Sequence, residues 1–136
     1  MSNIKKIILT LMLVCLSACG PLPEHEMMRV SSPDQLVDAV LVRVDTFAMD
    51  NYAYKIYVVP AGQKAGKEEN TILVAEDLDG VKITWVAKQL VVSFASGEVF
   101  QYHNRWLSAQ IKDQQTVDFY EVKIFLVDRN SPIRPE

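Results

Sequence analysis

Short stretches of alternating polar and apolar residues recur along the chain after residue 36, and they constrain its fold more than any other feature. Successive side chains of a β-strand point to opposite faces, so a period of two predicts strands with one buried face. In residues 119–127, Glu121 and Lys123 face out between the inward residues Tyr120, Val122, Ile124 and Leu126. The expected strands are 37–46, 54–59, 71–75, 81–86, 90–95, 99–103 and 119–127.

The links between these strands are mostly short and polar. Residues 60–70 (PAGQKAGKEEN) form a loop, 76–80 (EDLDG) and 96–98 (SGE) are expected turns, and 104–118 is a longer connection. Ser32-Pro33-Asp34-Gln35 could open a short helix, but the β-branched residues that follow favour a turn into a strand. The sequence therefore predicts an all-β fold, an antiparallel meander of about seven strands that forms a small sandwich or an open barrel. A β-propeller is excluded because the chain has too few strands and no internal repeat.

The amino terminus carries a secretion signal. Lys5 and Lys6 precede the apolar run 7–16 (IILTLMLVCL). Ten helical residues extend about 15 Å, half of the roughly 30 Å hydrocarbon core of a bilayer, so the run is too short to span it. A signal peptide over residues 1–18, removed in the mature protein, explains this pattern.

Leu16-Ser17-Ala18-Cys19 (LSAC, 16–19) follows the apolar run and resembles the lipobox of bacterial lipoproteins. The resemblance implies cleavage before Cys19, a diacylglycerol on its thiol and acylation of its freed amine. Two or three acyl chains give stable membrane anchoring. The alternative is a plain signal peptide cut after Ala18, which leaves Cys19 as a free thiol. Gly20 after the cysteine implies, by the same resemblance, the outer membrane facing the periplasm if the source is Gram-negative.

Cysteine use and charge follow from this processing. Cys15 and Cys19 are the only cysteines, so the folded part has none for a disulfide, a thiolate metal site or a nucleophile. Removal of Lys5 and Lys6 changes the net charge from −3 to −5, and no basic cluster supports nucleic-acid binding. The length of 136 residues suits a single domain. We expect a lipidated Cys19 and a flexible tether over 19–32, where prolines interrupt any pattern, followed by one β domain over 33–136.

Part of the folded region resembles a group of small bacterial lipoproteins and membrane-attached proteins built on a domain of unknown function. The similar stretches are SPD at 32–34, DAVLVRVD at 38–45, NYAYKIYVVPAGQ at 51–63 and GVKITW at 80–85. Members of that group often have Gly and Lys after SPD, where this chain has Gln35 and Leu36. The group has no established activity, so the resemblance implies no catalytic residue.

His103, Arg105 and Trp106 are the candidate contact residues for a partner. Histidine can exchange a proton, arginine binds anions in a bidentate manner, and an exposed tryptophan is a typical anchor of an interface. No serine elbow or paired acid motif accompanies them, so no catalytic residue is expected. The alternative is a strand end where Trp106 fills the core.

Two acidic clusters are compatible with a metal site by composition but not by spacing. Glu24, His25 and Glu26 lack the HExxH arrangement, and residues 76–80 lack the alternating ligands of a calcium loop. We therefore expect neither a metal nor a cofactor, and interpret the clusters as tether and hairpin turn.

These features predict an envelope lipoprotein that acts as a non-enzymatic binding or accessory module. Its contacts are expected on the loops 60–70 and 104–118, because loops on a rigid sheet commonly carry recognition. One alternative is an inhibitor or protective lipoprotein that binds a secreted enzyme or toxin. Another is an envelope hydrolase.

Overall fold

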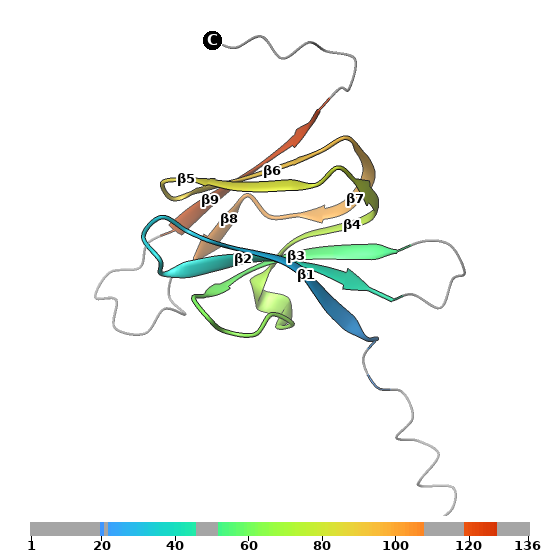
Figure 1. Cartoon of the computed structure of the whole chain (residues 1–136), viewed down its shortest axis with the longest axis horizontal. Helices are drawn as coiled ribbons and strands as arrows, with labels where there is room; N and C mark the ends of the chain where they lie inside the picture. Colours follow the sequence, from blue (N-terminus) through green and yellow to red (C-terminus); the bar gives the residue numbers. More distant parts are fainter. Residues whose placement is uncertain (1–19, 21, 46–51, 108–118, 128–136) are drawn as a thin grey trace, which may run out of the picture.

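The computed structural model describes residues 20, 22–45, 52–107 and 119–127. Its strands form two open sheets that face each other (Figure 1). The first sheet has the order β1 (Glu24–Ser31), β2 (Val37–Val44), β3 (Ala53–Pro60), β4 (Thr71–Asp79) and β7 (Ser96–Tyr102). The second has the order β5 (Lys82–Val86), β6 (Gln89–Phe94), β9 (Phe119–Leu126) and β8 (Arg105–Leu107). The all-β prediction is confirmed, and of the two expected forms the structure is the sandwich.

Strands β2, β3 and β4 form an antiparallel meander, as predicted, and β1 extends it at one edge. One pair in the second sheet departs from that pattern, because β6 and β9 run parallel. The chain passes from β7 in the first sheet to β8 in the second, and β9 then pairs antiparallel with β8. Since β9 lies between β8 and β6, its backbone groups are paired on both sides.

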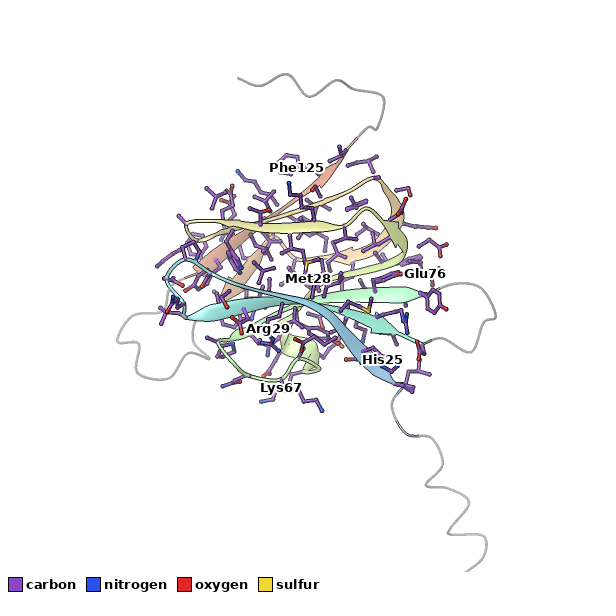
Figure 2. All side chains as sticks on the ribbon, in the orientation of Figure 1. His25, Met28, Arg29, Lys67, Glu76 and Phe125 are labelled. Carbon is purple, nitrogen blue, oxygen red and sulfur yellow. The ribbon has the colours of Figure 1, made fainter. Side chains whose placement is uncertain are left out.

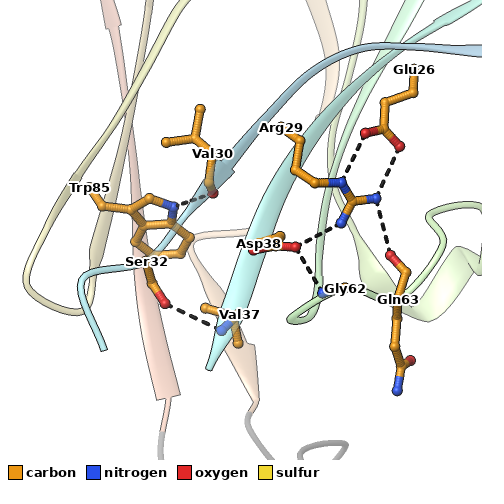
Figure 3. Close-up of polar contacts among 9 residues, drawn as sticks. All are labelled: Glu26, Arg29, Val30, Ser32, Val37, Asp38, Gly62, Gln63 and Trp85. Carbon is orange, nitrogen blue, oxygen red and sulfur yellow. Dashed lines mark hydrogen bonds and ion pairs between the residues drawn. The ribbon is translucent and has the colours of Figure 1, made fainter. Parts of the chain in front are cut away.

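The core lies between the two sheets and is built by the inward face of each strand. Ile56, Val58 and Leu73 come from the first sheet and meet Leu90 and Val92 from the second, all fully buried. Burial of each such side chain stabilises the fold by about 1.5–3 kcal/mol. Along one edge, Trp85 closes the sandwich because its Nε1 donates to the carbonyl oxygen of Val30 at 2.9 Å (Figure 3).

Strand β2 is buried on both faces. Ala39 and Leu41 face the core, whereas Val40 and Val42 face the opposite side of the sheet. Val40 and Val42 pack with Tyr57, Val59 and Ala65, so the loop after β3 rather than the second sheet covers this face. That loop folds back beneath the sheet in Figure 1 and ends in a 3₁₀ turn, η2 (Glu68–Asn70).

The flexible tether predicted for 19–32 is wrong over residues 24–32. Residues 24–31 form β1, which pairs with β2 from Glu24–Val44 to Ser31–Asp38, and Ser32 is buried. The strand has no clear alternation because it lies at the sheet edge with mostly exposed side chains, and a bulge at Met27 shifts its register. Backbone pairing rather than a buried face holds it in place.

Three strand boundaries and the direction of one side chain also differ from the prediction. Strand β4 continues through the expected turn at 76–80, because Asp77 adopts a φ of 50° and Leu78 returns to the core. Residues 96–98 belong to β7 rather than to a hairpin loop, and β8 occupies the start of the expected loop 104–118. Leu126 was expected to face inward but is 69% exposed.

Candidate functional site

An open groove of about 420 Å³ lies where β4 begins and β7 ends. It brings together the end of the loop 60–70 and the start of the segment 104–118, the two regions expected to carry contacts. The loop contributes η2, and the second region contributes β8. The lining residues are Glu68, Glu69, Thr71, Ile72, Gln101, His103, Arg105, Trp106 and Leu107.

The floor of the groove is rigid. Trp106 is 4% exposed, and its Nε1 donates to Oδ1 of the buried Asn70 at 3.2 Å. Its ring lies 5.9 Å from that of Tyr120, which Trp85 contacts edge-on from the other side. The interpretation of Trp106 as a core residue is therefore confirmed, and only its edge borders the groove. An exposed tryptophan anchor is wrong for this position.

The rim carries the other two candidate residues, and both are exposed. The side-chain amide nitrogen of Gln101 lies 2.8 Å from Nε2 of His103, so the two side chains are within hydrogen-bond distance. The guanidinium of Arg105 lies 5.3 Å from the centre of the Phe119 ring, within the range of a cation–π contact. Both side chains are thus positioned by neighbours and still accessible.

The groove has a mixed charge. Glu68 and Glu69 contribute carboxylates from η2, and Arg105 contributes a cation from β8. Within the part of the chain that the structure describes, none of these three forms an ion pair within 4.0 Å. A ligand can therefore bind them without first breaking a salt bridge. Among the same residues no carboxylate bonds to the His103 ring, so the orienting partner of a general base is not seen there.

A second hollow of about 340 Å³ lies between β1 and the loop after β3, but its two carboxylates, Glu24 and Glu26, are already paired. Glu24 accepts a hydrogen bond from the Tyr57 hydroxyl at 3.0 Å and lies 3.4 Å from Nζ of Lys55. Burial, and then the charge of Glu24, raises the pKa of the Tyr57 hydroxyl well above its usual value. These contacts of Glu24 hold β1 against the sheet, so we interpret the hollow as structural.

Neighbouring side chains of β1 point to opposite faces of the sheet, so His25 and Glu26 of the first acidic cluster have different partners. Nε2 of His25 pairs with Asp45 at 2.8 Å, whereas Glu26 pairs with Arg29 at 2.8 Å. Across the described ranges, no three His, Cys, Asp or Glu side chains converge in a way that could hold a metal ion.

Asp38 forms a buried polar network that sequence reasoning missed (Figure 3). Its carboxylate accepts hydrogen bonds from Nη1 of Arg29 at 2.8 Å and from the backbone N–H of Gly62 at 2.9 Å. Arg29 also bonds to Glu26 and, at 3.1 Å, to the carbonyl oxygen of Gln63. Burial raises the pKa of Asp38, but the Gly62 and Arg29 bonds outweigh it and the net shift is downward. The available signal was one carboxylate inside the apolar run of β2.

Asp34 connects the turn before β2 to the second sheet. Its Oδ1 accepts from the Leu36 N–H at 3.1 Å and from the Ser32 hydroxyl, and its Oδ2 accepts from the Tyr120 hydroxyl at 2.8 Å. The expected turn into a strand is thus confirmed. Desolvation raises the pKa of Asp34, yet these hydrogen bonds lower it overall.

Tyr120→Phe is expected to lower the free energy of unfolding by about 1–3 kcal/mol. The substitution removes the hydroxyl that donates to Asp34, and with it a hydrogen bond that links the turn before β2 to the second sheet. Urea denaturation of the β-sandwich without its acyl anchor measures the change. Tyr54→Phe is the matched control, since that hydroxyl makes no hydrogen bond within the described residues. Equal stabilities of the two variants would contradict the role of the Asp34 bond.

No family model, curated protein or solved structure matches the chain. The resemblance to small lipoproteins therefore stays a prediction. The described residues include no helix with the length and apolar character needed to cross a bilayer.

Proposed function

We propose that the chain is a lipoprotein of the bacterial cell envelope, anchored by acyl chains on Cys19, whose β-sandwich is a non-enzymatic binding or accessory module. The observation that carries the anchor is the LSAC motif at the end of an apolar run too short to span a bilayer. If the source has two membranes, Gly20 favours the outer membrane facing the periplasm.

The groove is the proposed contact site of this module. Its carboxylates and the Arg105 guanidinium are accessible on a floor that belongs to the core. Such a rim can pair with charged and hydrogen-bonding groups of a partner. Binding over the floor loses little conformational entropy, because the buried floor residues are already ordered. Among the candidate residues, Arg105 and His103 are the proposed contacts and Trp106 positions them.

Cys19→Ser is expected to abolish labelling by radioactive palmitate and to move the protein from the membrane to the soluble fraction. The reason is that the acylated thiol is absent, and nothing else in the proposed anchor can replace it. Cys15→Ser is the matched control, because that cysteine lies in the segment removed with the signal peptide. Labelling that persists in Cys19→Ser would contradict the proposal.

Photo-crosslinking in intact cells tests the groove. A photoreactive residue in place of Arg105 is expected to capture a specific partner, whereas one at the exposed Thr84 of β5 is the control for collisions. Equal adducts at the two positions, or none at Arg105, would contradict the contact site. A one-to-one adduct with a secreted enzyme or toxin would favour the inhibitor alternative. Turnover that is lost in His103→Ala would instead favour a hydrolase.

A further inference from the structure

The link between Cys19 and the folded domain is short. The carbonyl oxygen of Pro23 accepts a hydrogen bond from the backbone N–H of Asp45 at 3.1 Å, so the sheet pairing extends to Pro23. Only three residues separate it from Cys19, and the chain from Cys19 to Pro23 can span at most about 14 Å. An anchor at Cys19 therefore keeps this end of the sandwich near the lipid headgroups.

The register of the first sheet identifies which residues lie at that end. Glu24 pairs with Val44, Val44 with Ala53, Ala53 with Glu76, and Glu76 with Glu98, which makes one continuous row across the sheet. Figure 2 shows His25 and Glu76 at this same end of the molecule. The carboxylates of the row offer no attraction to anionic headgroups, so the short link rather than charge sets its position.

The groove lies toward the other end of the same strands. Thr71 in its lining is level with Tyr57, Val40 and Arg29, and this row is roughly 15 Å along β1 from Glu24. The turn η2 extends beyond that row because it precedes Thr71, whereas His103 and Gln101 lie short of it, level with Ile72 and Val74. The groove thus lies toward the end of the sheet opposite to the one at which the chain reaches Cys19.

We infer that the anchored domain stands on its Glu24–Glu98 row, and that the groove faces the aqueous side and takes a water-borne envelope protein or peptide rather than a lipid. This inference rests on the proposed anchoring through Cys19. The rim supports a protein partner, because carboxylates and a guanidinium next to exposed Leu107 match the mixed surface of a polypeptide.

Site-specific fluorescence quenching tests the orientation. The lipidated protein has no free thiol, so Glu98→Cys, Lys82→Cys and Val86→Cys each introduce a single labelling site. Lys82 and Val86 lie at opposite ends of β5, and Val86 is at the end where Trp85 contacts Val30. Each labelled protein is reconstituted in phosphatidylethanolamine–phosphatidylglycerol vesicles that contain nitroxide-labelled headgroups.

Quenching is expected to be at least several-fold greater at positions 98 and 82 than at position 86. A flexible Gly/Ser insertion of about 15 residues after Gly20 should remove this difference, because the end of the domain is then free to leave the surface. Equal quenching at all three positions with the native link would overturn the orientation, provided that the proteins incorporate palmitate and float with the vesicles. Proteins that do not float would overturn the anchoring itself.

The partner class is tested by the photoreactive residue at position 105 in intact cells. Adducts with a polypeptide support the inference, and adducts with lipid overturn it. The quenching result and the adduct are independent, so a wrong orientation and a wrong partner class are distinguishable.

Discussion

Trp106→Ala is expected to lower the free energy of unfolding by about 3–5 kcal/mol. The indole is 4% exposed, packs against Tyr120, and donates its N–H to Asn70, which is buried as well. Truncation leaves a cavity between the two sheets and an Asn70 oxygen without its donor, and both effects destabilise the fold. Chemical denaturation of the β-sandwich without its acyl anchor measures the loss.

Arg105→Ala is the matched control for Trp106→Ala. The Arg105 side chain is exposed, lies over the Phe119 ring and forms no ion pair with a described residue, so its loss should change the free energy of unfolding by less than about 1 kcal/mol. Partner capture should decrease in Arg105→Ala without a change in melting temperature. If Trp106→Ala has native stability and only loses its partner, the core role of Trp106 is wrong.

Arg29→Met is expected to lower the free energy of unfolding by about 2–3 kcal/mol at pH 7. The substitution keeps the length of the side chain but leaves the carboxylate of Asp38, which is 3% exposed, without its ion pair. The loss is smaller than for a fully isolated charge because the N–H of Gly62 still donates to Asp38. Loop 61–67 and β1 both depend on this network, so both should also lose protection in hydrogen exchange.

The stability difference between wild type and Arg29→Met is expected to depend on pH. The folded-state pKa of Asp38 lies below the unfolded value of about 3.9, so the stability that this carboxylate contributes is present above pH 4. It is lost as the pH falls through the folded pKa, and the pKa of Glu26, lowered by its bond to Arg29, acts in the same direction. The difference between wild type and Arg29→Met should therefore be largest near neutral pH and should decrease in acid.

Lys55→Met separates the Arg29 network from ion pairs in general. The Lys55–Glu24 pair is longer, at 3.4 Å, and partly exposed on both sides, so its loss should cost at most about 1 kcal/mol. Equal losses of unfolding free energy in Arg29→Met and Lys55→Met would show that the burial of Asp38 does not increase the effect of losing its ion pair.

Sequence reasoning succeeded where one side chain in two is buried. Strand β9 is the clearest case, since Tyr120 and Val122 are buried and Glu121 and Lys123 are exposed, as the alternation predicts. Strand β1 was missed for the opposite reason, because a mostly exposed edge strand leaves no hydrophobic pattern to detect. The sequence did not decide whether Trp106 is buried or exposed, because tryptophan is common both in protein cores and at interfaces.

By itself, the sequence determined the proposed route to the membrane, the all-β class and most strand positions, since these depend on local composition and on a period of two. The tertiary structure decided which strands are neighbours, the parallel pairing of β6 with β9, and the length of the link to Cys19. It also brought Glu68 and Arg105 to one groove. Backbone N–H and C=O groups make these pairings, and because every residue except proline carries both, the pairing partners leave little trace in the sequence.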